Sequence, residues 1–332
     1  MTNRQAFLAA TLLGLALLGN GCVRSVPPSA PTTSTPATVA SPAVTAVPAS
    51  QPTANVAPGS WVPSTRGPWD GTLYRATSRD GLSFGSGTLV LKRAGVPNLL
   101  RTKDGRIILT YQYFSDTDQS MFDVISYSAS DDDGATWTDP KAIMLSELPA
   151  PLDEKKHPMD PTLVQADDGS LRLYFTYHAS GRQHAELYSA TNARGDIAGT
   201  FVANPTPALS IADKNLLDPS VVLFDGTWHH FSWQDGSDDN FHSTSADGLT
   251  FARQADVNLP MDFLGQAVSA GSGIRMYGTG KGGIISAFSA DGFSWKTDSG
   301  SRAQGADPGV TRLADGTYLM VYAAANFNEA PR

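Results

Sequence analysis

Hydrophobic and polar residues alternate along most of the chain in short runs that are typical of β-strands. One element recurs after such runs: Ser-x-Asp, then Gly, then an aromatic residue. Asp and Gly favour a tight turn, and the Ser or Asp side chain can hydrogen-bond to the turn amides. The element therefore predicts a repeated hairpin. Its copies begin at Ser78, Ser130, Ser245 and Ser289, with a degenerate fifth from Ser189 to Phe201.

A second element alternates with the first. It is a strand start that is often Asp-Pro, followed by an Asp-Gly turn and an aromatic-rich strand. Proline fits the first residue of a strand, where no ladder donor is lost. Together the two elements supply four strands, so five such pairs predict five four-stranded units. The second element begins near Val96, Asp160, Asp218, Met261 and Asp307.

The order of the two elements predicts how the units join. A Ser-x-Asp turn at Ser78 precedes every Asp-Pro start, whereas the last start, at Asp307, has no such turn after it. Residues from about Leu73 to Leu91 should therefore supply the outer strands of the unit begun by residues 307–322, which removes open edges. We expect an all-β fold over residues 61–332: a five-bladed β-propeller with antiparallel blades, closed by N-terminal strands. A six-bladed ring is the main alternative.

The first 60 residues have a different character. Arg4 and the apolar run from Ala6 to Leu18 resemble a signal peptide, which is too short to be a permanent membrane span. Cys22 follows directly and resembles the lipidated cysteine of bacterial lipoproteins, with ordinary secretion as the alternative. Residues 23–60 are rich in Pro, Ala, Ser and Thr, which predicts a disordered tether. We expect a lipid-anchored protein of the bacterial cell envelope, with the membrane contacted through that anchor alone.

Charge and cysteine content exclude some classes of function. The formal net charge is -8, which disfavours binding to nucleic acid. Cys22 is the single cysteine, so the chain can form no internal disulfide or Cys-based structural zinc site. An Asp-rich loop from Asp235 to Asp239 could bind calcium, although a solvated loop is the simpler interpretation. We expect no other cofactor, and a monomer.

Residues Ser130 to Trp137 resemble an Asp-box at every position, a motif found at blade hairpins of sialidase-like and related propellers. The whole folded part resembles five-bladed propeller glycosidases of the arabinanase, xylosidase and fructosidase kind. Those families place acidic residues, usually two Asp and one Glu, on the innermost strands around a funnel. The resemblance implies a glycoside hydrolase acting on an oligosaccharide, with Asp160, Asp218 and Asp307 as catalytic candidates.

Propeller topology gathers further residues at the same mouth, because strand starts and the loops between second and third strands share one face. Asn98 should take the corresponding place in a fourth blade, and His157 is a further candidate for the catalytic acid. Candidates for substrate binding are Asn98, His178, Arg182, His184, Trp233, Asp235, Asp262 and Lys281. Trp233 could stack on a sugar ring.

The sequence also departs from the glycosidase pattern. Its glutamates are Glu147, Glu154, Glu186 and Glu329, and none of them begins an inner strand. An Asp or a histidine would therefore have to act as the acid. The Asp-Pro pairs could instead cap their own strands. Two alternatives remain beside hydrolysis: a non-catalytic propeller that binds glycan or protein, and an exo-sialidase-like enzyme, which the lack of an arginine beside Val96 disfavours.

Overall fold

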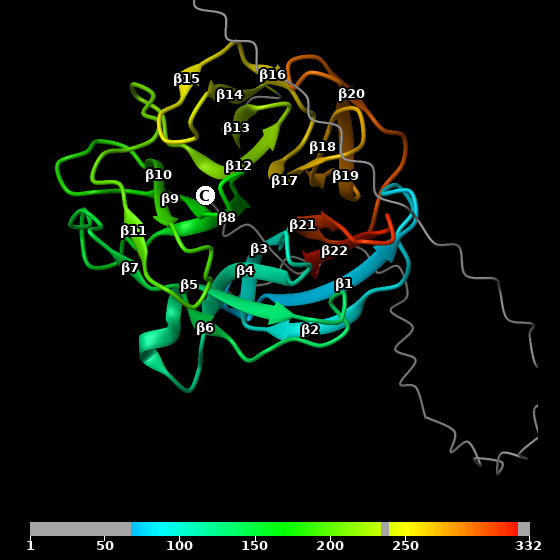
Figure 1. The fold of residues 1–332 in the computed structure, drawn as a ribbon, viewed down its shortest axis with the longest axis horizontal. Helices are drawn as coiled ribbons and strands as arrows, with labels where there is room; N and C mark the ends of the chain where they lie inside the picture. The colour runs from blue at the N-terminus through cyan, green and yellow to red at the C-terminus, as the bar shows by residue number, and fades with distance from the viewer. Residues whose placement is uncertain (1–67, 234–238, 325–332) are drawn as a thin grey trace, which may run out of the picture. The chain divides into compact units, whose positions relative to one another are not determined.

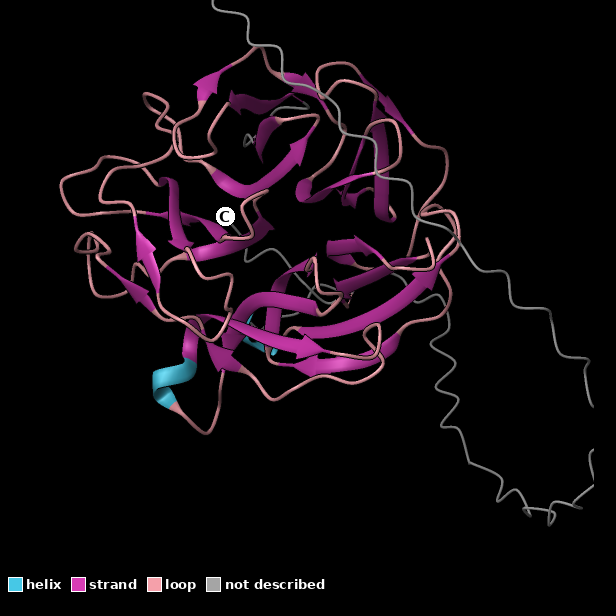
Figure 2. Ribbon diagram, in the orientation of Figure 1, coloured by secondary structure: helices cyan, strands magenta, loops and turns pink. Residues whose placement is uncertain are grey.

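The folded part of the chain consists almost entirely of β-strands. The computed structural model describes residues 68–233 and 239–324 (Figure 1), so Cys22 and Asp235 lie outside the described residues. Two short 3-10 helices, η1 (Pro68–Asp70) and η2 (Gln119–Met121), interrupt the strands (Figure 2). Within these ranges, no helix has the length and apolar character needed to cross a membrane.

The strands form five sheets around a common centre, and each sheet has one innermost strand (Figure 1). The first blade contains β3 (Ala94–Arg101), β4 (Ile107–Phe114), β5 (Phe122–Ser130) and β6 (Lys141–Ala142). The second contains β8 (Met159–Gln165), β9 (Leu171–Tyr177), β10 (Glu186–Asn192) and β11 (Phe201–Ala203), and β7 (Leu145–Ser146) pairs in parallel with β11.

The third blade contains β12 (Leu217–Phe224), β13 (Thr227–Trp233), β14 (Asp239–Ser245), β15 (Ala252–Arg253) and β16 (Val257–Asn258). The fourth contains β17 (Phe263–Ser269), β18 (Ile274–Gly280), β19 (Gly283–Ser289) and β20 (Trp295–Thr297). The inner strands are β3, β8, β12, β17 and β21. We call the face at which they begin the upper face.

The fifth blade joins the two ends of the folded part, as the order of the sequence elements predicts. It contains β21 (Ala306–Arg312), β22 (Tyr318–Ala323), β1 (Thr72–Ser78) and β2 (Thr88–Lys92). Strand β1 pairs antiparallel with β22 from Leu73 opposite Ala323 to Ser78 opposite Tyr318. Figure 1 shows the blue β1 beside the red β22. The predicted five-bladed ring and its closure are confirmed, and the six-bladed alternative is wrong.

The hydrophobic core is divided among the junctions between neighbouring blades. Five clusters of buried side chains lie there, one at each junction. Between the third and fourth blades, for example, Phe231 of β13 packs with Ile274 and Met276 of β18, and all three are fully buried. Each blade packs its two faces against the two neighbouring blades. The aromatic-rich second strands are therefore covered on both sides.

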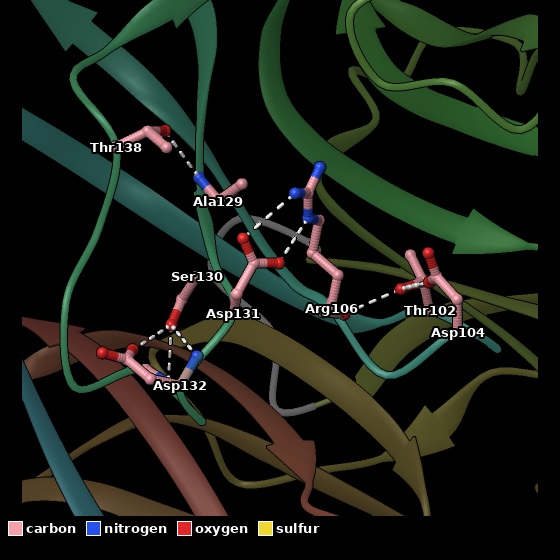
Figure 3. A network of polar contacts seen from close by, with 9 residues as sticks. Thr102, Asp104, Arg106, Ala129, Ser130, Asp131, Asp132 and Thr138 are labelled. Atoms are coloured by element: carbon pink, nitrogen blue, oxygen red, sulfur yellow. Dashed lines mark hydrogen bonds and ion pairs between the residues drawn. The ribbon is translucent and has the colours of Figure 1, made fainter.

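The Ser-x-Asp turns lie on the lower face and attach each blade to its neighbour. In the first blade the Ser130 hydroxyl accepts from the Gly134 amide at 2.8 Å and donates to Asp132, as Figure 3 shows in part. Gly134 has a φ of +80°, and a Cβ there would meet Leu319 of the fifth blade at 2.6 Å. The glycine therefore provides both the turn conformation and the close packing between blades.

Side chains of three inner strands each bond to the inner strand of the next blade. The Asn98 side-chain oxygen accepts from the Leu163 amide at 3.0 Å, and the Ser220 hydroxyl oxygen accepts from the Ala267 amide at 2.7 Å. Between them, the Thr162 hydroxyl donates to the carbonyl of Pro219. These contacts hold the first four blades together close to the axis.

Gln266 of β17 completes this ring of contacts, which we call the inner girdle. Its side-chain oxygen accepts from the amides of Leu99 (2.8 Å) and Val310 (2.9 Å), and its nitrogen donates to the Leu99 carbonyl (2.7 Å). One buried amide thereby bridges the first, fourth and fifth blades. Gly309 allows the same approach, since a Cβ there would lie 2.6 Å from the carbonyl oxygen of Pro97.

A candidate active site at the ring axis

Each inner strand contains an irregularity close to its start. The ladder between first and second strands shifts register there in all five blades, as between Met159 and Thr162. In four blades a residue with positive φ occupies the shift: Val96 (49°), Asp160 (56°), Asp218 (47°) and Asp307 (47°). Such a bulge redirects a side chain and needs no ladder donor, which accounts for the proline that follows. The prolines therefore lie inside the strands and not at their first residues.

The bulges bring the three Asp residues to one small cavity on the axis. Asp160, Asp218 and Asp307 line it together with Val96 of the first blade and Leu264 of the fourth. Its volume is about 10 Å³, room for about one water molecule. Three carboxyls from three blades thus face a common space, with apolar side chains in the remaining two sectors.

The Asp side chains do not cap their own strands. The Asp160 carboxylate accepts from the Asp218 amide of the next blade at 3.4 Å, and the Asp307 carboxylate accepts from the Thr279 hydroxyl at 3.5 Å. Among residues 68–233 and 239–324, no cationic side chain forms an ion pair with any of the three. The three residues are half-buried and have no cation beside them, which makes their ionised forms costly, so these positions favour protonation.

The electrostatics of the cavity raise the pKa of all three groups. Burial raises the pKa of Asp218 well above its ordinary value, and the charges of Asp160 and Asp307 add to the effect. Burial and then the Asp160 charge raise the pKa of Asp307 to about 6. Burial also raises the pKa of Asp160, although the Thr176 hydroxyl and the Asp218 amide stabilise its ionised form. In a cluster of carboxyls whose pKa values differ, one carboxyl can keep its proton and act as an acid beside an ionised carboxyl that acts as a base.

Asn98 does not take the position that the sequence suggested. The register places Val96 at the level of Asp160, while Asn98 lies two residues further along and uses its side-chain oxygen in the inner girdle. It still lines the axial cavity. The prediction that Asn98 is equivalent to Asp160 is wrong. A bulge is not visible in the hydrophobic pattern, so the sequence does not show that Val96 occupies that position.

A larger depression opens on the upper face beside the axial cavity. It has a volume of about 400 Å³ and is bounded by Met159 and Leu217, the residues that directly precede Asp160 and Asp218. Three of the predicted site residues line this depression, namely His157, His178 and His184. Thr176, which stabilises the Asp160 carboxylate, lines it as well. We call this depression the histidine pocket.

The other predicted residues have different surroundings. Arg182 forms a bidentate ion pair with the buried Glu186 and does not line the pocket. Trp233 packs on Phe263 of the next blade, with ring centroids 5.1 Å apart, so part of its ring is already covered. Asp262 and Lys281 are exposed and line neither cavity. Asp235 lies outside the described residues, and so does the proposed calcium loop up to residue 238.

Sequence reasoning missed the residues that act on the carboxyls from neighbouring strands. Thr176 and Thr279 stand close to the upper ends of second strands, and Asp123 is the second residue of β5, where the Gln112 amide donates to it at 2.8 Å. The charge of Asp123 contributes to the raised pKa of Asp160. A polar residue at the end of an otherwise apolar second strand is the signal that could have identified Thr176 and Thr279.

The described residues contain no group of three or more His, Cys, Asp or Glu side chains placed to hold a metal ion. No arginine is among the described residues that line the axial cavity or the histidine pocket.

Comparison with solved structures defines the class of fold. An α-L-arabinofuranosidase from Clostridium thermocellum matches 69% of this chain and 81% of its own, with a TM-score of 0.52 and 16% identity. An exo-β-1,3-galactanase from Phanerochaete chrysosporium matches 75% and 64%, with a TM-score of 0.52 and 13% identity. A putative glycoside hydrolase from Parabacteroides distasonis matches 71% and 88%, with a TM-score of 0.51 and 14% identity.

These likenesses concern the fold alone, a five-bladed propeller that this chain shares with those structures. No model of a protein family matches the sequence. No curated protein matches it either.

Proposed function

We propose that this protein is a glycoside hydrolase-like propeller that acts on an oligosaccharide at its upper face. The observation that carries the proposal is the axial cavity: three carboxyls from three blades face one space without a cation and without capping their own strands. Burial of that kind opposes folding and is typical of groups retained for chemistry. The glycosidase-type fold supports a carbohydrate as the substrate class.

The differing environments assign a role to each carboxyl. Asp218 has the strongest tendency to keep its proton and would protonate the glycosidic oxygen as the general acid. Asp160 would act as the base or nucleophile, because the Asp218 amide and the Thr176 hydroxyl stabilise its anion. Asp307 is the third carboxyl; it does not line the histidine pocket, and its charge raises the pKa of Asp218.

A screen of aryl glycosides and oligosaccharides on the purified protein tests the proposal. Turnover of at least one substrate class is expected, and Asp160→Asn and Asp218→Asn should each reduce it strongly while the fold is retained. Thr297→Ala, on the exposed outer strand β20, is a suitable control. Absence of both turnover and glycan binding across the screen would contradict the proposal.

A second candidate is glycan binding without catalysis. The axial cavity has room for about one water molecule, and Val96 and Leu264 supply apolar walls where carboxyls could stand. Glu186, which directly follows the pocket residue Ala185, is held in an ion pair by Arg182 and does not line the pocket. Binding in the same screen that survives Asp218→Asn, with no turnover by the unmodified protein, would support this candidate.

We also propose that the protein is lipid-anchored through Cys22 to a bacterial cell envelope. The position of the single cysteine directly after an apolar segment supports it. Cys22→Ser should move the protein from the membrane fraction to the soluble fraction. Ser25→Ala, a change of similar size close by, is the control, and unchanged fractionation of Cys22→Ser would contradict the anchor.

A further inference from the structure

The walls of the histidine pocket are held in place by hydrogen bonds of the backbone. The loop before β8 is pinned to the loop after β9, where the Leu152 amide donates to the His178 carbonyl at 2.9 Å. The segment before β12 forms a further wall of the pocket. There the Ala185 amide donates to the Asn215 side chain, and the Leu216 amide donates to the Ala185 carbonyl, both at 2.9 Å. The lining side chains therefore project from a fixed frame.

The electrostatic character of this pocket is opposite to that of the chain. Lys156 lines it together with the three histidines, and no Asp or Glu is among its described lining residues. The nearby carboxylate of Glu186 is neutralised by Arg182. Other acidic residues also lie close by: the exposed carboxylate of Asp213 is 3.8 Å from His184, and Asp153 and Glu154 precede Lys156 in the same loop. In a chain of net charge -8, a concave wall of one lysine and three imidazoles is a distinct feature.

The distribution of histidines strengthens this point. The chain has six, and the three outside the histidine pocket are His229, His230 and His242 of the third blade. Those three are buried, and burial lowers the pKa of each, so they serve packing. All the histidines that are not core residues thus line this single depression.

We propose that the histidine pocket binds the oxyanion of an acidic sugar, the carboxylate of a uronic acid or the sulfate of a sulfated sugar. This inference rests on the proposed function and names the class of its substrate. Lys156 supplies the charge, and His157, His184 and the Asn215 amide supply hydrogen-bond donors, while the Nε2 of His178 already donates to the Arg182 carbonyl at 3.1 Å. A sugar held in this way lies beside Met159 and Leu217, next to the two carboxyls assigned to catalysis.

Imidazole NMR signals of the full chain carrying Cys22→Ser provide a direct test. D-glucuronate, D-glucose 6-sulfate and D-glucose are titrated separately, and the three buried histidines serve as an internal reference. An acidic sugar should shift the signals of His157, His178 and His184, and glucose should shift them less. Whether glucuronate or the sulfate ester binds more tightly distinguishes the two oxyanions. Added salt should weaken the binding.

Substitution of the lysine makes the test specific. Lys156→Gln should weaken binding of the acidic sugar about fivefold or more, the equivalent of about 1 kcal/mol. Lys296→Gln removes the same charge on the outer strand β20 and should have no effect. Equal shifts by glucose, or an unchanged affinity in Lys156→Gln, would overturn the inference while leaving the proposed function intact.

The glycan screen described above separates the remaining outcomes. If none of the three monosaccharides shifts the pocket signals, the ligands found in the screen decide. Acidic ligands that require Lys156 would support the inference, and neutral ligands would overturn it alone. If no glycan of either kind is bound or hydrolysed, the proposed function fails together with the inference.

Discussion

Aspartates at the two faces of the ring have opposite environments. On the lower face, the carboxylates of the Ser-x-Asp turns accept hydrogen bonds from amides of their own turns: Asp80, Asp132, Asp247 and Asp291. The Thr136 amide and hydroxyl, for example, lower the pKa of Asp132 to about 2. At the axis, Asp160, Asp218 and Asp307 have few donors and raised pKa values.

The comparison shows that the supply of local donors decides what an Asp can do. Figure 3 shows the satisfied case, in which Ser130 bonds to Asp132 while the neighbouring Asp131 pairs with Arg106. Such a carboxylate stabilises its turn and has no proton to give at neutral pH. An axial carboxyl costs stability and gains the capacity to exchange a proton.

The largest expected effect comes from the same substitution made at both faces. Asp218→Asn should lower turnover about 10²- to 10⁴-fold, since it removes the acid, and should not lower the melting temperature, because a neutral amide replaces a carboxyl that already favours its protonated form. Asp247→Asn is the matched variant at the lower face. It should leave turnover unchanged and lower the melting temperature. Rate assays and thermal denaturation measure both, and a lower melting temperature for Asp218→Asn would contradict the contrast.

The inner girdle beneath the axial cavity should be more sensitive to loss of polar groups than the cavity itself. Gln266→Leu leaves the buried amides of Leu99 and Val310 without their acceptor, which should lower the free energy of unfolding by about 3 kcal/mol. Denaturant unfolding measures the loss. Gln304→Leu, at an exposed glutamine, should change stability little, and equal effects would show that the girdle bonds contribute nothing.

The two groups of Asp also predict how stability depends on pH. The pKa of Asp307 is about 6 in the folded protein and near 3.8 in the unfolded chain. The folded state therefore retains a proton that the unfolded state releases, and stability falls as pH rises from about 4 to about 6, by about 1 to 3 kcal/mol. The lower-face carboxylates act in the opposite direction, since their lowered pKa values cost stability as pH falls below about 4.

Unfolding at a series of pH values checks this dependence. Asp307→Asn should remove much of the decline between about pH 4 and pH 6 and should be more stable than the unmodified protein above it. Asp291→Asn, at a lower-face turn, should leave that decline in place. A profile of Asp307→Asn that matches the unmodified protein would show that another group titrates.

The smallest effect is expected within a single lower-face turn. Ser130→Ala leaves the Gly134 amide without its acceptor and should cost about 1 to 2 kcal/mol. Ser294→Ala, at an exposed serine of another turn, should cost much less. Thermal unfolding distinguishes the two, and equal stability would mean that the hydroxyl contributes no net free energy.

The sequence predicts the ring better than it predicts the site. Each blade has its own turn residues, such as Asp132 and Gly134, so the number of blades and the offset at Ser78 can be read from local patterns. The meeting of Asp160, Asp218 and Asp307 also follows, because equivalent strand positions converge at the axis. The sequence does not reveal that Val96, and not Asn98, occupies the equivalent position in the first blade, since this depends on the register of a bulge. Gln266 and Trp233 depend on contacts between blades, which one sequence does not reveal.

The shared fifth blade has a consequence for the order in which the protein folds. Leu73 and Ala323 are paired although about 250 residues separate them, so the entropy of closing that loop is among the largest in the molecule. During synthesis β1 and β2 emerge before the other strands of the ring, and their partner β22 follows only after the other four blades. The ring can therefore close only when all five blades have emerged. Until it closes, β1 and β22 expose unpaired edges that a neighbouring chain can occupy.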